Sequence, residues 1–261
     1  MCDTNLKVSV KEMKSNIPFR AYTKKTVYTG GMFLYKKIQC FLSIALVVAA
    51  FLIGRAAGTA AVNENSTKIR NDKTKVVVLD AGHGGRDSGK VGINKSLEKD
   101  INLSITKKLK EELKKNGIEV VMTRTKDQGE HKAEDLKKRV EIINNTHPDL
   151  AVSIHQNSYP KESIKGAQVF YYKNSKEGER AAIIMQENLK KLDPANKRCA
   201  KADNTYYILK KTKVPVIIVE CGFLSNWEEA EKLNSEDYQR KAAQTICEGV
   251  LSFLDQGKAG E

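Results

Sequence analysis

Two of the four histidines in the chain lie at or shortly after the ends of short apolar runs. His83 follows residues 76–79 within the segment VVVLDAGHGG, and His155 follows residues 150–154, LAVSI. A short apolar run that is closed by glycine or polar residues is typical of a buried strand. Ligands of open α/β sheets bind beyond the carboxyl ends of the strands. We therefore expect both imidazoles to lie where such a fold carries out its chemistry.

Two glutamates occupy comparable positions. Glu220 follows the apolar run 215–219, PVIIV, and Glu98 falls in the first turn of a predicted helix. Two histidines and one carboxylate with an open fourth position form the ligand set of hydrolytic zinc enzymes. A second carboxylate can then serve as general base for the attacking water. The residues alone do not divide these two roles between Glu98 and Glu220, and a first-turn glutamate is also favoured by the helix dipole.

The other histidines and the buried cysteines are assigned structural roles. His131 lies in a charged segment and His147 precedes a proline, so both are predicted to be surface or helix-capping residues. Cys221 and Cys247 stand in apolar contexts and are predicted to be in the core. The five cysteines show no close spacing, which argues against a disulfide framework or a zinc ribbon.

Strand and helix patterns alternate along residues 75–255. Strands are predicted at 76–79, 118–123, 150–154, 166–172, 206–209 and 215–219, and helices from a cap at Ser96 to residue 116, and at 133–146, 175–192, 226–233 and 236–254. This alternation predicts a single α/β domain with a largely parallel or mixed twisted sheet, covered by helices on both faces. In that topology His83, His155 and Glu220 all project from carboxyl ends of strands.

The amino-terminal part of the chain has a different composition. Residues 38–54, IQCFLSIALVVAAFLIG, contain no charge, and eight Lys or Arg residues precede them. This pattern indicates a secretory signal peptide or a membrane anchor rather than a core helix. The excess of positive charge before the segment places the amino end in the cytoplasm and the rest of the chain outside.

These patterns divide the chain into five parts. They are a cytoplasmic segment 1–37, a signal peptide or anchor 38–54, a linker 55–74, a catalytic domain 75–255 and a tail 256–261. Met32 offers an alternative start, in which case residues 1–31 are not translated. Amino-terminal mass analysis of protein made from its native gene tests this hypothesis, and peptides upstream of Met32 would contradict it.

The net charge of +13 does not indicate a nucleic-acid-binding protein. Residues 1–61 carry nine basic and two acidic residues, which accounts for +7. The other 200 residues carry 36 basic and 30 acidic residues, and this mixture is typical of a solvated surface.

Five separated motifs resemble those of the zinc-dependent N-acetylmuramoyl-L-alanine amidases, in the same order. They are LDAGHGGRDSG (79–89), EKDINL (98–103), TR (123–124), SIHQNS (153–158) and VECGFLSN (219–226). The resemblance covers about residues 75–255. It implies one zinc ion per chain, bound by His83, Glu98 and His155, with Glu220 as the catalytic residue. It also implies hydrolysis of the amide bond between N-acetylmuramic acid and L-alanine in peptidoglycan. Gln156 stands where alanine is common in the family, which leaves the ligand set intact.

The short build with an amino-terminal hydrophobic segment further resembles the spore-cortex amidases of endospore formers. That resemblance implies a role in muramic lactam formation by a catalytic domain outside the cytoplasm, secreted or anchored through residues 38–54, with the forespore intermembrane space as one location. It leaves open an accessory protein partner. The alternatives are a zinc peptidase acting on the stem peptide and a non-catalytic wall-binding module.

Overall fold

The computed structural model describes residues 74–129 and 131–256. The predicted hydrophobic segment 38–54, the segment before it and the linker up to residue 73 lie outside the described residues, as does most of the predicted tail. Within the described ranges, no helix is both long and apolar enough to cross a membrane.

The centre of the fold is a six-stranded mixed sheet with the order β2-β1-β3-β6-β4-β5. Its strands are β1 (Val76–Ala81), β2 (Glu119–Met122), β3 (Leu150–Asn157), β4 (Gln168–Tyr172), β5 (Lys201–Asp203) and β6 (Val216–Phe223). Strands β2, β1, β3 and β6 are parallel, whereas β4 runs antiparallel to β6 and parallel to β5. The predicted α/β class with a largely parallel or mixed sheet is confirmed.

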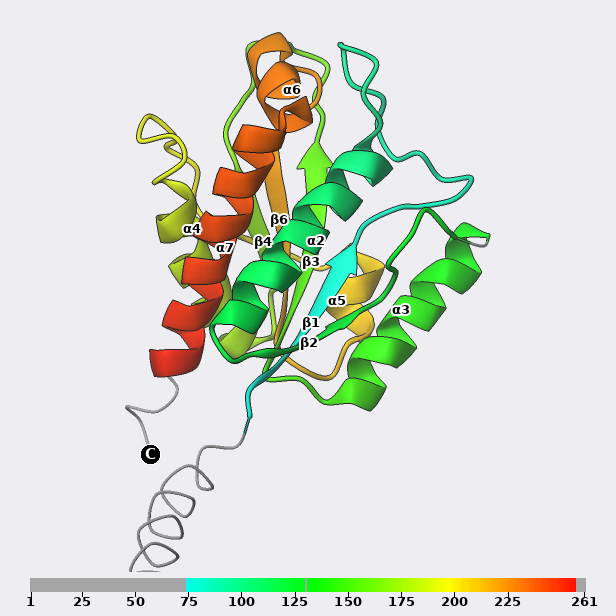
Figure 1. Ribbon diagram of the computed structural model, residues 1–261, viewed down its shortest axis with the longest axis vertical. Coiled ribbons are helices and arrows are strands. Elements are labelled where there is room, and N and C mark those ends of the chain that lie inside the picture. The colour runs from blue at the N-terminus through cyan, green and yellow to red at the C-terminus, as the bar shows by residue number, and fades with distance from the viewer. Residues whose placement is uncertain (1–73, 130, 257–261) are drawn as a thin grey trace, which may run out of the picture. The chain divides into compact units, whose positions relative to one another are not determined.

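Helices cover both faces of the sheet, as predicted (Figure 1). On one face lie α2 (Glu98–Lys115), α4 (Lys176–Leu189) and α7 (Glu236–Gln256), which also pack against one another. On the other face lie α3 (Lys132–Thr146) and the short α5 (Tyr207–Lys211). Helix α6 (Trp227–Asn234) packs against β6 and α7. The apolar stripe predicted for α2, which comprises Ile101, Ile105, Leu109 and Leu113, is buried in the larger of the two cores.

Alternation along the strands decides which polar side chains share a face. Side chains of a strand point to opposite faces in turn. In β6, Ile217 and Val219 belong to the core beneath α2, α4 and α7, whereas Ile218 belongs to the core beneath α3 and α5. Glu220 therefore shares the face of Ile218. His155 is the register partner of Glu220 in the adjacent parallel strand β3, so both side chains lie on that face.

The strands predicted at 150–154 and 215–219 end later than expected. Strand β3 continues through His155 to Asn157, and β6 continues through Glu220 to Phe223. Both functional candidates thus belong to the last residues of their strands rather than to the loops that follow. The strand ends were predicted from the apolar runs, but the pairing of β3 with β6 extends past those runs. It includes a register shift between His155 and Asn157.

The predicted strand at 206–209 is wrong, because this segment begins helix α5, and the strand in this region is β5. Periodicity cannot distinguish strand from helix in so short an apolar run. The chain turns here because Asp203 Oδ1 accepts hydrogen bonds from the backbone N–H groups of Thr205 and Tyr206.

The predicted helix cap at Ser96 is also wrong. Helix α2 begins at Glu98, with Leu97 at the N-cap position. The Ser96 hydroxyl donates instead to Asn94 Oδ1, 2.6 Å away, and stabilises the loop before the helix.

Candidate metal centre

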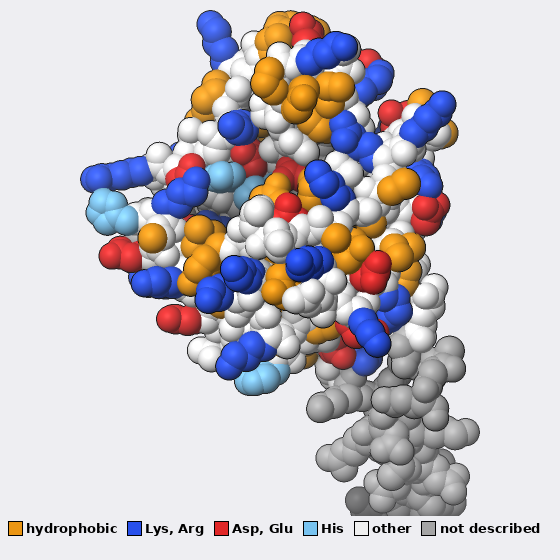
Figure 2. All heavy atoms as spheres, turned by 180° about the vertical axis from the view of Figure 1, so that it is seen from behind, with side chains coloured by type: hydrophobic (Ala, Val, Ile, Leu, Met, Phe, Trp, Pro, Cys, Tyr) orange, Lys and Arg blue, Asp and Glu red, His pale blue; other side chains and the backbone are white. Residues whose placement is uncertain are grey.

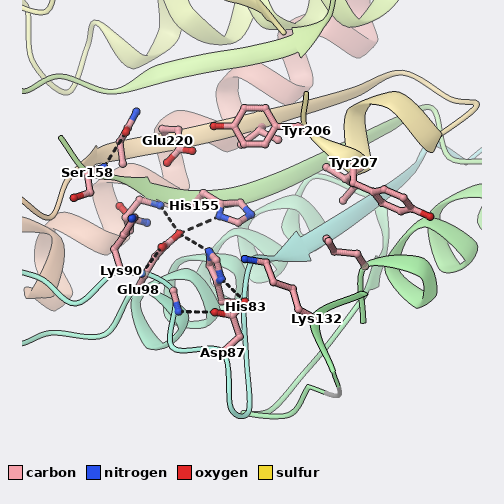
Figure 3. Close-up of a pocket in the computed structure, with 16 residues that line it drawn as sticks. His83, Asp87, Lys90, Glu98, Lys132, His155, Ser158, Tyr206, Tyr207 and Glu220 are labelled. Carbon is pink, nitrogen blue, oxygen red and sulfur yellow. Dashed lines mark hydrogen bonds and ion pairs between the residues drawn. The ribbon is translucent and has the colours of Figure 1, made fainter. Parts of the chain in front are cut away.

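The side chains of His83, Glu98 and His155 converge at the carboxyl edge of the sheet (Figure 3). They come from the loop after β1, the first residue of α2 and the end of β3. Glu98 Oε1 lies 3.2 Å from His83 Nε2 and 3.0 Å from His155 Nδ1. One ligand atom from each of the three residues lies within 4.8 Å of the other two. The structure thus brings together the three residues predicted as metal ligands.

Glycines leave the space that this approach requires. A Cβ atom on Gly82 would lie 2.2 Å from His155 Cε1, and a Cβ atom on Gly89 would lie 2.5 Å from Glu98 Oε2. Gly89 also has a φ of +67°, which residues with a Cβ rarely adopt. The glycine-rich segment therefore forms a cradle for one imidazole and one carboxylate.

Asp87 orients the first histidine. Its Oδ2 lies 2.9 Å from His83 Nδ1, and its Oδ1 accepts the Gly89 N–H, so the other ring nitrogen of His83 faces Glu98. Burial opposes ionisation of Asp87, but the hydrogen bonds from His83 and Gly89 hold its pKa below the ordinary value. Such a carboxylate partner is typical of metal-binding histidines. Asp87 was not among the residues predicted from the sequence, although an acidic residue four positions after a glycine-flanked histidine is a usable signal.

Glu98 is held as an anion. Its Oε2 accepts the Lys90 N–H at 2.8 Å, and its Oε1 accepts the Gln156 N–H at 3.1 Å. Burial alone would raise the pKa of Glu98, but the hydrogen bonds and charges of His155 and His83 outweigh burial and hold the pKa far below its usual range. Two nitrogen donors and one anionic oxygen match the requirements of a catalytic zinc site, so the residues present fit this metal.

Glu220 lies apart from these three side chains, across the cavity (Figure 3). It is 5% exposed, and within the described part of the chain its Oε2 has no hydrogen-bond partner. Burial raises the pKa of Glu220 to about 7, with a further increase from the Glu98 charge and a partial offset from the two imidazoles. A carboxylate with a pKa near neutrality can accept a proton and return it.

The four residues border one cavity of about 420 Å³. Its wall is completed by groups of three kinds, namely the polar residues Asp87, Gln156, Asn157 and Ser158, the lysines Lys90 and Lys132, and the aromatic and apolar residues Leu136, Tyr206, Tyr207, Ile208 and Ile218. Seen from behind, the surface is hollowed where acidic and histidine side chains meet (Figure 2).

The remaining histidines and the cysteines lie elsewhere. His131 and His147 are exposed at the N-cap and C-cap positions of α3, in agreement with their predicted surface or capping roles. Cys221 and Cys247 are buried, as predicted, and Cys199 is exposed.

A buried ion pair supports the backbone on which His83 stands. Asp80, 2% exposed, accepts hydrogen bonds from Arg139 Nη1 at 2.7 Å, from Thr123 and from Ser153. Arg139 also donates to the carbonyl oxygens of Ala81 at 2.6 Å and His83 at 2.7 Å. These bonds hold the backbone of His83, whose φ of +60° lies in the left-handed region.

Replacement of Arg139 by methionine is expected to lower the free energy of unfolding by about 3–5 kcal/mol, because Asp80 would be left buried without its charge partner. Urea denaturation followed by circular dichroism measures this change. Arg240→Met is the matched control, since Arg240 forms an exposed pair with Glu236 and such pairs contribute about 0–1 kcal/mol. Equal stability losses in both variants would contradict the assigned role of Arg139.

Comparison with known proteins connects this site to a family. The family model described as N-acetylmuramoyl-L-alanine amidase matches residues 77–252. The germination-specific N-acetylmuramoyl-L-alanine amidase of Bacillus subtilis is 38% identical over 192 residues, which are 70% of this chain and 81% of that protein.

Solved structures show the same similarity. The CwlD amidase of Clostridioides difficile, solved in complex with the GerS lipoprotein, aligns with a TM-score of 0.67 and 38% identity, and the match covers 70% of this chain and 99% of that one. The catalytic domain of the amidase CwlV from Bacillus (Paenibacillus) polymyxa aligns with a TM-score of 0.64 and 34% identity over 70% of this chain and 99% of that one.

Proposed function

Because the chain belongs to the N-acetylmuramoyl-L-alanine amidase family, we propose that His83, Glu98 and His155 bind a zinc ion and that Glu220 is the catalytic residue. The enzyme hydrolyses the amide bond between N-acetylmuramic acid and L-alanine in peptidoglycan. The observation that carries the assignment of roles is the convergence of three ligand atoms on one side of the cavity, with a buried, unpaired carboxylate on the other.

The proposed chemistry divides between the ion and the chain. Zinc, when bound, would act as a Lewis acid that polarises the scissile carbonyl. It would also lower the pKa of water, so that hydroxide is available as the nucleophile at neutral pH. Glu220 takes a proton from the attacking water and returns it to the leaving amine of L-alanine. Its pKa of about 7 suits both transfers. Asp87 keeps the ring of His83 in one orientation, His155 and His83 keep Glu98 ionised, and the backbone N–H groups of Lys90 and Gln156 hold its carboxylate in place.

Digestion of purified peptidoglycan by residues 62–261 tests the activity, the metal and the domain boundary together. We expect a soluble fragment with about one zinc ion per chain that releases stem peptides beginning with L-alanine, detected by mass spectrometry. Intact muramoyl-alanine with cut cross-links would instead indicate a zinc peptidase, and binding without products would indicate a wall-binding module. Precipitation of the fragment would contradict the proposed catalytic domain 75–255.

The relatives also motivate a proposal for the site of action. Relatives of this chain include a germination-specific amidase and a protein described as a probable cell wall amidase, which supports action outside the cytoplasm on spore cortex. We propose that residues 38–54 direct or anchor the chain there. Cortex from cells that lack the gene should then contain little muramic lactam, measured by muropeptide analysis, and normal lactam content would contradict the cortex role.

An accessory partner is a further proposal. The C. difficile relative was solved in complex with the GerS lipoprotein, which motivates a search for a lipoprotein that binds this chain. Purification of the chain from sporulating cells, followed by mass spectrometry of what elutes with it, tests the proposal. Recovery of the active chain alone would contradict it.

A further inference from the structure

Tyr206 forms part of the cavity wall opposite the three proposed ligands. It is the residue before α5, and its ring extends over the cavity with the hydroxyl facing Glu220 (Figure 3). Within residues 74–129 and 131–256 this hydroxyl makes no hydrogen bond. None of the proton transfers proposed for Glu220 uses it, and the sequence predicted Tyr206 only as part of a strand at 206–209.

The position of Tyr206 is fixed although its hydroxyl is free. The ring packs against Phe170 with 5.6 Å between ring centroids. The Tyr206 N–H donates to Asp203 Oδ1 at 3.1 Å, and the Tyr206 carbonyl accepts the Lys210 N–H in the first turn of α5. A donor that is already in place when charge develops stabilises a transition state more than one that must be reoriented.

The phenol also lies in the electrostatic field of both glutamates of the site. Burial raises the pKa of Tyr206 to about 12, and the charges of Glu220, Asp203 and Glu98 add to this increase. The hydroxyl therefore keeps its proton at neutral pH and can only act as a neutral donor or acceptor. Tyr206 borders the same cavity as Glu98 and Glu220, and a substrate amide that reaches both of these residues has to enter that cavity.

Three other donors that line the cavity, on Gln156, Lys90 and Lys132, meet these requirements less well. The Gln156 amide N–H₂ is already bonded to Asn102 Oδ1 at 3.1 Å. Lys90 and Lys132 have long side chains that would have to be ordered during the reaction, whereas the Tyr206 ring, although 36% exposed, packs on Phe170. Tyr206 combines a fixed ring with a free hydroxyl.

We propose that Tyr206 is a further catalytic residue, whose hydroxyl donates a hydrogen bond to the oxygen of the scissile carbonyl as negative charge develops there. This proposal rests on the proposed function of the site. It identifies Tyr206 as the group of the chain that stabilises the negative charge on the carbonyl oxygen. No covalent bond to Tyr206 is formed, and its proton stays on the phenol throughout.

Tyr206→Phe in the full-length chain tests the proposal, because it removes the hydroxyl and keeps the ring that packs on Phe170. We expect kcat on purified muropeptides to fall by about 10²-fold, the usual effect of removing one such donor, with KM and zinc content unchanged. Tyr171→Phe is the control, since it removes a hydroxyl that donates to Glu179 outside the cavity. Its kcat should equal that of the unsubstituted chain.

Inhibitor binding gives a second readout. A phosphinate analogue of the muramoyl-alanine bond has a tetrahedral centre, so its inhibition constant should rise in Tyr206→Phe by the same factor by which kcat/KM falls. Unchanged kcat, an increase in KM alone, or loss of zinc together with activity would each overturn the proposal. These outcomes differ from failure of the proposed function, in which the unsubstituted chain itself would lack zinc or amidase products.

Discussion

Glu220→Gln is expected to lower kcat by about 10²–10⁴-fold, the usual contribution of a general base, while zinc remains bound. Glutamine preserves the shape of the side chain but removes its charge and its basicity. Glu220 stands apart from the three proposed ligands, and its Oε2 has no partner among the described residues, so the loss should fall on proton transfer. A buried carboxylate without a partner also costs free energy, and the variant is therefore expected to be no less stable to urea.

The comparison that tests this assignment is with Glu98→Gln. Glu98 Oε1 contacts both imidazoles, so its neutral analogue should lose zinc affinity and activity together. Zinc measured by atomic emission and turnover measured on purified peptidoglycan separate the two cases. Loss of zinc from Glu220→Gln with retention by Glu98→Gln would mean that the roles are reversed.

His83→Ala and His155→Ala are each expected to reduce zinc affinity by more than about 100-fold and to abolish hydrolysis. Loss of a residue that only hydrogen-bonds to a metal ligand costs up to about 100-fold, and loss of a ligand itself should cost more. Each variant removes one of three donors from a cluster whose ligand atoms lie within 4.8 Å of one another. Competition with a chromogenic chelator measures the affinity of the metal-free protein directly. That readout does not depend on turnover.

His131→Ala and His147→Ala are the controls for these variants. Both side chains are exposed, at opposite ends of α3 and outside the cavity wall. Their zinc affinity and turnover should match those of the unsubstituted chain. Full zinc occupancy in His83→Ala or in His155→Ala would contradict the ligand assignment.

Short-range patterns in the sequence determined the fold class and the location of the site. The apolar runs before His83, His155 and Glu220 identified strands whose carboxyl ends meet at one edge, because parallel strands that lie side by side end together. The four-residue spacing of apolar residues in α2 predicted a buried stripe, and the structure confirms it. These features are recoverable because burial on one face imposes a period that a linear sequence displays.

The tertiary structure alone decided how the two glutamates differ. Apart from the family resemblance, the sequence contexts of the two residues left their roles open. In the fold, Glu98 contacts His83 and His155, whereas Glu220 lies across the cavity with an unpaired oxygen. The difference arises from strand register and from the close approach that Gly82 and Gly89 permit.

The positions of Arg139 and Tyr206 in the site could not be predicted from the sequence. Arg139 lies on a charged helix like any surface arginine, yet it is buried against Asp80, 59 positions away. Tyr206 belongs to a run that we predicted as a strand, and it enters the cavity wall because Asp203 turns the chain into α5. The contact of Arg139 with Asp80 depends on how α3 packs on the sheet, and no local period records that packing.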